Sequence, residues 1–329
     1  MEVIRGIENV TDSCKGGVVT LGFFDGFHKG HQALAARAKS LAAQSGSHVV
    51  IYTFDRHPLE IVEPSRAPLL LTTLEEKIGI AEKSGVEFFL AGEFDQNLSR
   101  MEPGVFLKEI VADRLNARRL VVGYNYRYGR GHAGNVETLR RDAGSLGIPV
   151  EVVDAVIVGG EAVSSSRIRR VVAEGSVAEA ASLLGRPYAL TGTVVKGDGR
   201  GKTLGVPTAN IKVDPRKLVP KIGIYAGIAA VEKSRAGALI SIGNRPTFGG
   251  GERVIEIHLL DFNGDLYGKN LTVELTAWIR DEEKFSSAEA LMEKMREDIA
   301  KGREVLERGT AAHSIQDCID KEGFPVDKT

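Results

Sequence analysis

Two histidines three positions apart follow an apolar run near the start of the chain and could bind phosphate. The run Val18–Leu21 leads into Gly-Phe-Phe-Asp-Gly-Phe-His-Lys-Gly-His, which begins at Gly22 and ends with His28 and His31 in its last four positions. Glycines let the backbone approach a ligand closely, and the free N–H groups at the start of a helix favour an anion. Because a helical pattern opens directly afterwards, the segment predicts a strand, a turn and a helix that together hold a triphosphate.

Three further segments of the first half combine basic or imidazole side chains with turn or helix-start residues. They are Thr53–Pro58 (Thr-Phe-Asp-Arg-His-Pro), Gly123–His132 (Gly-Tyr-Asn-Tyr-Arg-Tyr-Gly-Arg-Gly-His) and Ser164–Arg169 (Ser-Ser-Ser-Arg-Ile-Arg). The serines of the third segment are explained equally well as helix caps or as donors to a phosphate that Arg167 and Arg169 neutralise. The arginines of the second segment, taken alone, are more typical of a solvated surface. Neither His57 nor His132 is decisive by itself.

A glycine-rich segment with local positive charge is the main signal of the second half. Gly192–Gly205 contains Lys196, Arg200 and Lys202 among its glycines, and it does not match the Walker pattern of P-loop proteins. Such a segment suits a cover over phosphates, although a hairpin loop without ligand explains glycine and charge alone. The string Pro-Thr-Ala-Asn, which ends at Asn210, follows directly.

Glu256 and His258 lie on one side of an expected strand in the second half. They alternate with apolar residues in Val254–Leu259, and side chains two positions apart point to the same face of a strand. From this pattern alone, an exposed pair and a functional carboxylate are equally good interpretations.

Alternating strands and helices are expected to position the residues of the first half. The expected strands are 18–21, 48–54, 86–91, 118–122 and 150–156, and the expected helices are 32–43, 74–84, 105–115 and 135–146. Alternation of this kind predicts a parallel sheet covered by helices on both faces, with ligands at the carboxyl ends of the strands. The polar segments at Gly22, Thr53 and Gly123 all follow expected strands.

The second half has the pattern of an all-β barrel or sandwich followed by one helix. After a helical pair at 167–173 and 177–184, strand-like runs at 189–196, 225–231, 238–242, 254–259 and 271–279 are separated by turn residues. An amphipathic helix is expected at 287–307, and the polar tail from Gly309 carries no recognisable motif. We place the domain boundary so that residues 1–185 form one domain and residues 186–329 form the other.

Composition excludes several classes of protein. The chain has 329 residues and a net charge of −1, so global charge favours neither nucleic acid nor membrane as a partner. The two cysteines, Cys14 and Cys318, lie near opposite ends and predict no disulfide framework. The first residues lack a signal-peptide pattern, and no apolar run approaches the length of a membrane span. We therefore expect a cytoplasmic protein that is a monomer or a weak homo-oligomer.

The four motifs of the first half resemble the adenylyltransferase half of bacterial bifunctional FAD synthetases. They occur in the family's order and cover most of residues 18–170. The resemblance implies a Rossmann-like nucleotidyltransferase domain in which the phosphate of FMN attacks the α-phosphorus of ATP, giving FAD and pyrophosphate, with Mg²⁺ on the phosphates. It implies catalytic roles for His28, His31 and Arg167, nucleotide contacts at Gly22, Phe24, Asp25, Gly26, Gly30, Ser164 and Arg169, and flavin contacts at His57, Asn125 and Tyr126. Many members have Asp-Phe where this chain has Asn125-Tyr126, but asparagine keeps a hydrogen bond and tyrosine keeps an aromatic wall.

The motifs of the second half resemble the riboflavin kinase domain of the same family. Besides Pro-Thr-Ala-Asn, they include Gly-Asn-Arg-Pro-Thr-Phe from Gly243, Glu-Ile-His-Leu-Leu-Asp-Phe from Glu256, and the block that contains Arg280. The resemblance implies a kinase β-barrel in which Glu256 takes the proton of the riboflavin 5′-hydroxyl while that oxygen attacks the γ-phosphate of ATP. It implies metal binding by Thr208 and Asn210, nucleotide contacts at Gly197, Gly199, Lys202 and Gly205, and a flavin contact at Arg280.

Two alternatives to a bifunctional enzyme remain open at this point. Only one half could be active, or the chain could bind flavin and nucleotide as a sensing regulator without turnover. The second alternative predicts the loss of a chemically required group, and the motifs show no such loss.

Overall fold

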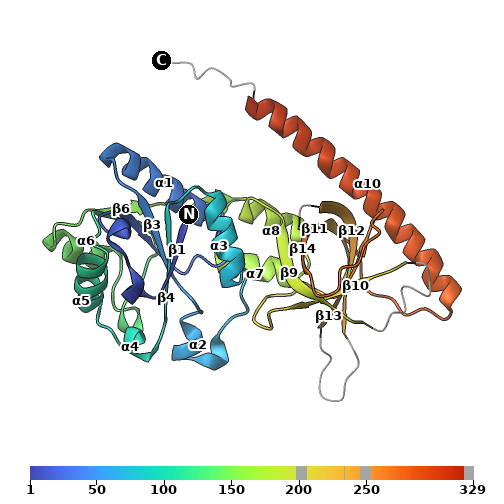
Figure 1. The fold of residues 1–329 in the computed structure, drawn as a ribbon, viewed down its shortest axis with the longest axis horizontal. Helices are drawn as coiled ribbons and strands as arrows, with labels where there is room; N and C mark the ends of the chain where they lie inside the picture. The colour runs from blue at the N-terminus through green and yellow to red at the C-terminus, as the bar shows by residue number, and fades with distance from the viewer. Residues whose placement is uncertain (198–205, 233, 245–252, 322–329) are drawn as a thin grey trace. The chain divides into compact units, whose positions relative to one another are not determined.

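The computed structural model describes residues 1–197, 206–232, 234–244 and 253–321. The chain divides into two compact units, the first formed by residues 1–169 and 183–185 and the second by residues 170–182 and 186–329 (Figure 1). The expected boundary between residues 185 and 186 stays a prediction.

The first unit is built on a parallel sheet, which confirms the expected fold class. Six strands lie in the order β1-β4-β3-β2-β5-β6, and every pair of neighbours is parallel. Their bounds are β1 Glu2–Arg5, β2 Val18–Leu21, β3 Val49–Phe54, β4 Phe88–Gly92, β5 Arg119–Gly123 and β6 Val150–Val153. The chain runs from β2 to β3 and β4 on one side and then to β5 and β6 on the other. The order therefore reverses between β2 and β5, and such a switch point is where sheets of this kind bind ligands.

Two hydrophobic clusters fill the two faces of this sheet. One contains buried residues of α1 (Lys29–Ser45) and α3 (Leu74–Lys83), and the other contains buried residues of the π-helix η4 (Phe106–Arg114) and α6 (Val136–Ser145). Figure 1 shows α1, α3 and α6 beside the strands of this sheet. Shorter elements are α2 Leu59–Val62, α4 Gln96–Ser99, α5 Pro103–Val105, β7 Ile157–Val158, β8 Glu161–Ala162, and the 3-10 turns Ile7–Asn9, Asp12–Cys14, Pro64–Arg66 and Arg130–His132. Helices on both faces of a parallel sheet bury its apolar strands, as the alternating pattern predicts.

The second unit is a closed antiparallel barrel with a long helix, which also confirms the expected class. The strands close in the order β10-β13-β12-β11-β14-β9, with β9 and β10 paired. Their bounds are β9 Tyr188–Val195, β10 Ala209–Val213, β11 Gly223–Val231, β12 Ser234–Asn244, β13 Arg253–Leu259 and β14 Asn270–Arg280. The helices are α7 Ser165–Ala173, which begins in the first unit, α8 Val177–Leu184 and α10 Ala288–Lys321. No strand was expected at β10, which closes the barrel, and α10 extends beyond residue 307, where the last helix was expected to end.

Candidate functional site

The turn between β2 and α1 has an unusual backbone that is fixed from several sides. Phe24, Gly26 and Phe27 have φ values of 55°, 79° and 39°. This left-handed region costs a residue other than glycine roughly 1 kcal/mol or more and persists only where surrounding contacts impose it. The two phenylalanine rings are almost completely buried, and Gly26 N donates to Thr72 Oγ1 at 2.9 Å. The turn is therefore anchored in the core by its two aromatic rings and by its hydrogen bond to Thr72.

His28 and His31 are brought together at the start of α1. His28 is the N-cap residue of the helix, and its ring stacks on that of His31 with 3.7 Å between the centroids and 17° between the planes. His31 also meets the edge of the Phe24 ring, 5.1 Å away between centroids. The helix start adds its own N–H groups and the positive end of its dipole. Two imidazoles at this place, beside the switch point of the sheet, form a site suited to a polyphosphate.

Asp25 is used inside the protein, where it joins three segments. Its carboxylate is 2% exposed and accepts hydrogen bonds from Leu71 N at 3.0 Å and from Thr72 N at 3.0 Å. Arg169 Nη2 on α7 donates to the same carboxylate at 2.6 Å, and Arg169 Nε donates to Leu69 O at 2.9 Å. The pair Asp25–Arg169 thus ties the turn to the segment before α3 and to the start of α7.

The start of α7 carries the serines and the other arginine of the expected anion site. Ser164 Oγ accepts a hydrogen bond from Arg167 N at 3.3 Å, and Ser165 Oγ donates to Asp25 O at 2.9 Å. Arg167 Nη1 donates to Val158 O at 2.8 Å in the small hairpin of β7 and β8. Ser164 therefore caps the helix, as one interpretation of these serines expects. Arg167 stands at the same end, but it also donates to Glu161 O at 3.1 Å and pairs with Glu161 Oε2 at 3.5 Å, so the expected anion site stays a prediction.

The ends of β3 and β5 flank the turn. The edge of the Phe23 ring meets the His57 ring with 4.8 Å between the centroids, and Leu59 N donates to His57 Nδ1 at 3.1 Å. Burial lowers the pKa of His57, and the positive charge of Arg169 lowers it further. Beyond β5, Asn125 is exposed and Tyr126 stacks on Tyr128, with 5.7 Å between the ring centroids. The strand ends thus offer aromatic surfaces and a neutral imidazole near the turn.

Lys77 is a residue of this site that the sequence analysis missed. It lies on α3, is 2% exposed, and its Nζ donates to Phe23 O at 2.6 Å. Leu74 and Ala81 lie three positions before and four positions after it on the helix, so a lysine within the apolar stripe is the signal that could have revealed it.

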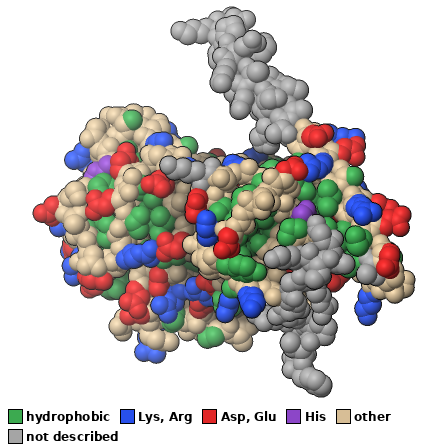
Figure 2. Space-filling view, turned by 45° about the vertical axis from the view of Figure 1, so that its right-hand side comes forward, with side chains coloured by type: hydrophobic (Ala, Val, Ile, Leu, Met, Phe, Trp, Pro, Cys, Tyr) green, Lys and Arg blue, Asp and Glu red, His purple; other side chains and the backbone are tan. Residues whose placement is uncertain are grey.

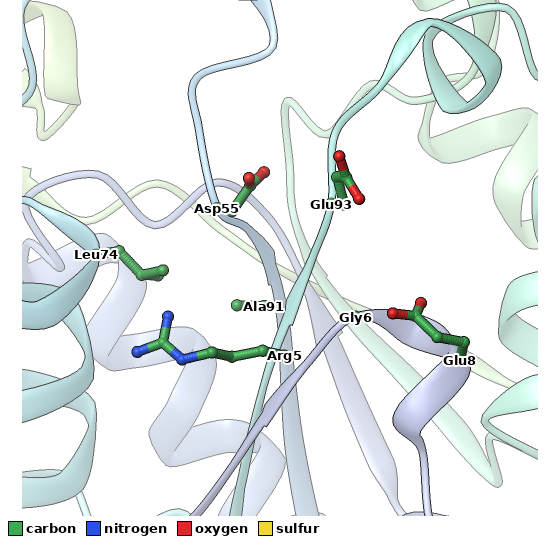
Figure 3. Close-up of a pocket in the computed structure, with 7 residues that line it drawn as sticks. All are labelled: Arg5, Gly6, Glu8, Asp55, Leu74, Ala91 and Glu93. Carbon is green, nitrogen blue, oxygen red and sulfur yellow. The ribbon is translucent and has the colours of Figure 1, made fainter.

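A pocket also lies at the carboxyl ends of β1, β3 and β4, away from the switch point (Figure 3). Its volume is about 310 Å³, and it contains one arginine and three carboxylates. The lining residues are Arg5, Gly6, Glu8, Asp55, Leu74, Ala91 and Glu93. Asp55 accepts a hydrogen bond from Phe94 N at 3.0 Å, so part of this acidic lining is engaged within the protein.

On the second unit, Glu256 and Asn210 share the outer face of the barrel. Glu256 lies between Ile255 and Ile257, which are 1% and 0% exposed inside the barrel, so its side chain belongs to the outer face. Asn210 on β10 pairs directly with Glu256, and side chains that face each other across two strands lie about 5 Å apart. Thr208 precedes Asn210 by two positions, just before β10, and the Nδ1 atom of His258 lies 2.9 Å from the carbonyl oxygen of the neighbouring Pro207.

Gly197 leaves room for Asn210. A Cβ atom at Gly197 would overlap the amide nitrogen of Asn210, so a larger residue would displace that side chain. Gly199, Lys202 and Gly205 lie outside the described residues, as does most of the Pro-Thr-Phe block.

Arg280 points to α10. Its Nε and Nη2 donate to Asp298 at 2.9 and 2.7 Å, and its Nη1 donates to Asp281 O at 2.8 Å. Asp298 is 6% exposed, and this ion pair raises the pKa of Arg280. Arg280 therefore fastens the C-terminal helix to the barrel, and its expected contact with flavin stays a prediction.

Charges of both signs are interspersed over the visible face of the molecule in Figure 2, in line with the small net charge. Among the helices that the structure describes, none is long and apolar enough to cross a membrane.

Comparisons with known proteins give consistent results for both units. Residues 10–167 match the family model of FAD synthetase, and residues 184–306 match the model of riboflavin kinase. A bifunctional riboflavin kinase/FMN adenylyltransferase of Escherichia coli K12 is 34% identical over 306 residues, covering 92% of this chain and 97% of the relative. A protein of the same name from Listeria monocytogenes is 36% identical over 283 residues, covering 85% of this chain and 90% of the relative. A solved structure named as a macrolide-efflux protein from Streptococcus pneumoniae has a TM-score of 0.85 and 30% identity, and the match covers 92% of this chain and 99% of that one.

Proposed function

This chain belongs to the family of bifunctional riboflavin kinases/FMN adenylyltransferases, and from that membership we propose how its own residues carry out the two reactions. The enzyme phosphorylates riboflavin to FMN and joins FMN to the AMP part of ATP to give FAD. Residues 1–185 are assigned to the second reaction and residues 186–329 to the first.

In the adenylyltransferase, an oxygen of the FMN phosphate forms a bond to the α-phosphorus of ATP. The bond from that phosphorus to the bridging oxygen breaks, and pyrophosphate leaves with the extra negative charge. The imidazoles of His28 and His31 and the N–H groups of α1 stabilise this charge, so no protein nucleophile is needed. The observation that carries the proposal is the stacked imidazole pair at the start of a helix beside the switch point.

The remaining residues of this half divide into those that bind and those that orient. Ser164 and Arg167 bind the triphosphate from the side of α7, and Gly22 and Gly30 leave space for it. Asp25 and Arg169 act by holding the turn, because Asp25 is 2% exposed and the pair that they form joins the turn to the segment before α3. We therefore propose that Asp25 and Arg169 orient the turn that carries the histidines and do not contact the nucleotide directly.

The flavin of FMN lies between the ends of β3 and β5, according to this proposal. His57, Asn125 and Tyr126 border that space, and the lowered pKa of His57 keeps its ring neutral near pH 7. A neutral ring and a tyrosine provide flat, weakly polar surfaces for an aromatic ligand.

In the kinase, Glu256 takes the proton of the riboflavin 5′-hydroxyl while that oxygen attacks the γ-phosphorus of ATP, and ADP leaves. Asn210 and Thr208 fit an Mg²⁺ ion, because both offer the neutral oxygen ligands that this ion accepts beside phosphates, and Asn210 lies directly across from Glu256. When bound, Mg²⁺ would neutralise negative charge on the phosphate group that is transferred. Gly197 keeps the backbone close to Asn210 and thereby fixes the orientation of its amide.

The test uses the full chain with riboflavin, ATP and Mg²⁺ and separates the flavins over time. FMN should appear first and FAD should follow. Parallel reactions use His28→Ala, which should make FMN without FAD, and Glu256→Gln, which should make FAD only when FMN is supplied. If either variant retained both reactions at the rate of the unaltered chain, the corresponding residue assignment would be wrong. A cytoplasmic location, a monomeric or weakly oligomeric state and the absence of nucleic-acid and membrane partners stay predictions.

A further inference from the structure

Lys77 presents an ammonium group to the interior of the first unit, underneath the turn that carries the histidines. Its Nζ donates to Phe23 O at 2.6 Å and to Thr53 Oγ1 at 3.3 Å, and it lies 4.0 Å from the centroid of the Phe23 ring. Phe23 follows β2 and Thr53 belongs to β3, so one cation joins the ends of two neighbouring strands to α3.

The fold does not need this cation to satisfy its backbone. Thr53 Oγ1 donates to Phe23 O at 2.9 Å, so the carbonyl has a second hydrogen bond that does not involve Lys77. A buried charge is costly unless it is well paired, and an apolar residue of similar volume is often as stabilising or more so. Burial indeed lowers the pKa of Lys77 to about 8. A group that destabilises the folded protein in this way commonly serves its function.

The charge of Lys77 interacts electrostatically with titratable groups of the turn and of the end of β3. The carboxylates that face it are Asp25 in the turn and Asp55 after β3, and both raise its pKa against the effect of burial. On the opposite side, Lys77 and Arg169 both lower the pKa of His57. Lys77 thus belongs to the same electrostatic cluster as the turn and the end of β3.

We propose that Lys77 is a positioning residue of the adenylyltransferase reaction, because its ammonium holds the Phe23 carbonyl and with it the turn that presents His28 and His31. The ammonium also adds positive charge next to Phe23, in the turn that leads to the two histidines. This inference rests on the proposed role of the two histidines. It adds a residue that positions them through the carbonyl group of Phe23.

Lys77→Met tests the proposal, with Lys83→Met on the exposed side of the same helix as the matched control. We expect kcat for FAD formation from FMN to fall roughly 10- to 100-fold, as for the loss of a hydrogen bond to a charged group, with KM for ATP within about threefold. Riboflavin phosphorylation should not change, and the melting temperature should stay the same or rise. Lys83→Met should leave all four quantities unchanged. A Lys77→Met protein that melts at a lower temperature but keeps its kcat would show a merely structural role and overturn the proposal.

The pH dependence of the unaltered chain provides a measurement that requires no variant to fold. Because burial lowers the pKa of Lys77 to about 8, we expect the rate of FAD formation to fall as the pH rises through that range, while riboflavin phosphorylation shows no matching decrease. A neutral amine can still donate to Phe23 O, so a flat rate of FAD formation between roughly one pH unit below and one above this value would overturn the role of the positive charge, while kcat of Lys77→Met decides the positioning role. His28→Ala is measured alongside: if it kept full activity, the proposed function of the site would fail. If His28→Ala lost activity and Lys77→Met did not, only the inference about Lys77 would fail.

Discussion

Replacing Asp25 by asparagine should destabilise the first unit and leave the second unit intact. The variant keeps one oxygen for the N–H groups of Leu71 and Thr72, but it turns an NH₂ group toward Arg169, whose Nη2 now lies 2.6 Å from a carboxylate oxygen. Removing one partner of a buried ion pair costs about 3–5 kcal/mol, because the other charge stays buried. The side chain of Arg169 is 18% exposed, so water reaches it and we expect the lower end, about 3 kcal/mol.

The single tryptophan of the chain makes this prediction measurable one unit at a time. Trp278 lies in β14, so its fluorescence follows urea unfolding of the second unit, whereas far-ultraviolet circular dichroism follows both units. With a urea dependence of about 2 kcal/mol per molar, a loss of about 3 kcal/mol moves the midpoint of the first unit down by about 1.5 M. The fluorescence transition should not move.

Asp12→Asn is the control, because Asp12 pairs with Lys15 at an exposed position of the same unit. It should shift neither transition. A shift of the circular dichroism midpoint for Asp25→Asn of less than about 0.5 M would refute the reasoning, since the carboxylate would then contribute no more than an ordinary hydrogen bond. A fluorescence transition that moved with it would refute the assumption that the units unfold independently.

Three further predictions concern the second unit. Glu256→Gln should lower riboflavin phosphorylation by roughly 10²- to 10⁴-fold, the usual contribution of a general base, without affecting FAD formation from supplied FMN; product analysis measures both. Gly197→Ala should displace the Asn210 amide and raise the Mg²⁺ concentration needed for half-maximal kinase activity, and an unchanged Mg²⁺ titration would contradict this. Asp298→Asn should break the buried pair with Arg280 and lower the stability of the second unit by about 3 kcal/mol, seen as an earlier urea transition in tryptophan fluorescence.

The sequence was sufficient to predict elements whose periodicity is strong. The five expected strands of the first half are all present within about two or three residues of their predicted bounds, and α1, α3 and α6 coincide with the expected apolar stripes. β1 was missed because Glu2–Arg5 has only two apolar residues and is stabilised by its pairing with β4, which no local pattern reveals. β10 was missed because Ala209–Val213 begins with an alanine and an asparagine, and only closure of the barrel makes it a strand.

The site was predicted in part for the same reason. Histidines at the start of a helix can be recognised from spacing, and the structure stacks them. The partners of Asp25 and Arg280 could not be predicted, because they are distant in the sequence. The partners of Asp25 lie 46 or more positions away, and the partner of Arg280 on α10 lies 18 positions away. Spacing indicates which side chains carry charge, but it does not indicate whether that charge faces a ligand or another side chain. The mutual pairing of Asp25 and Arg169 illustrates this limit.

The buried rings of Phe24 and Phe27 have a consequence for how such an enzyme can change over generations. Both rings belong to the cluster that joins α1 to the sheet, while their backbone atoms form the bend that leads to the imidazoles. Gaining or losing a methyl group in that cluster changes its volume, and this change should shift the bend, since close-packed interiors have few voids to absorb it. Substitutions that change the volume of this cluster are therefore expected to be accompanied by others that restore the geometry of the turn.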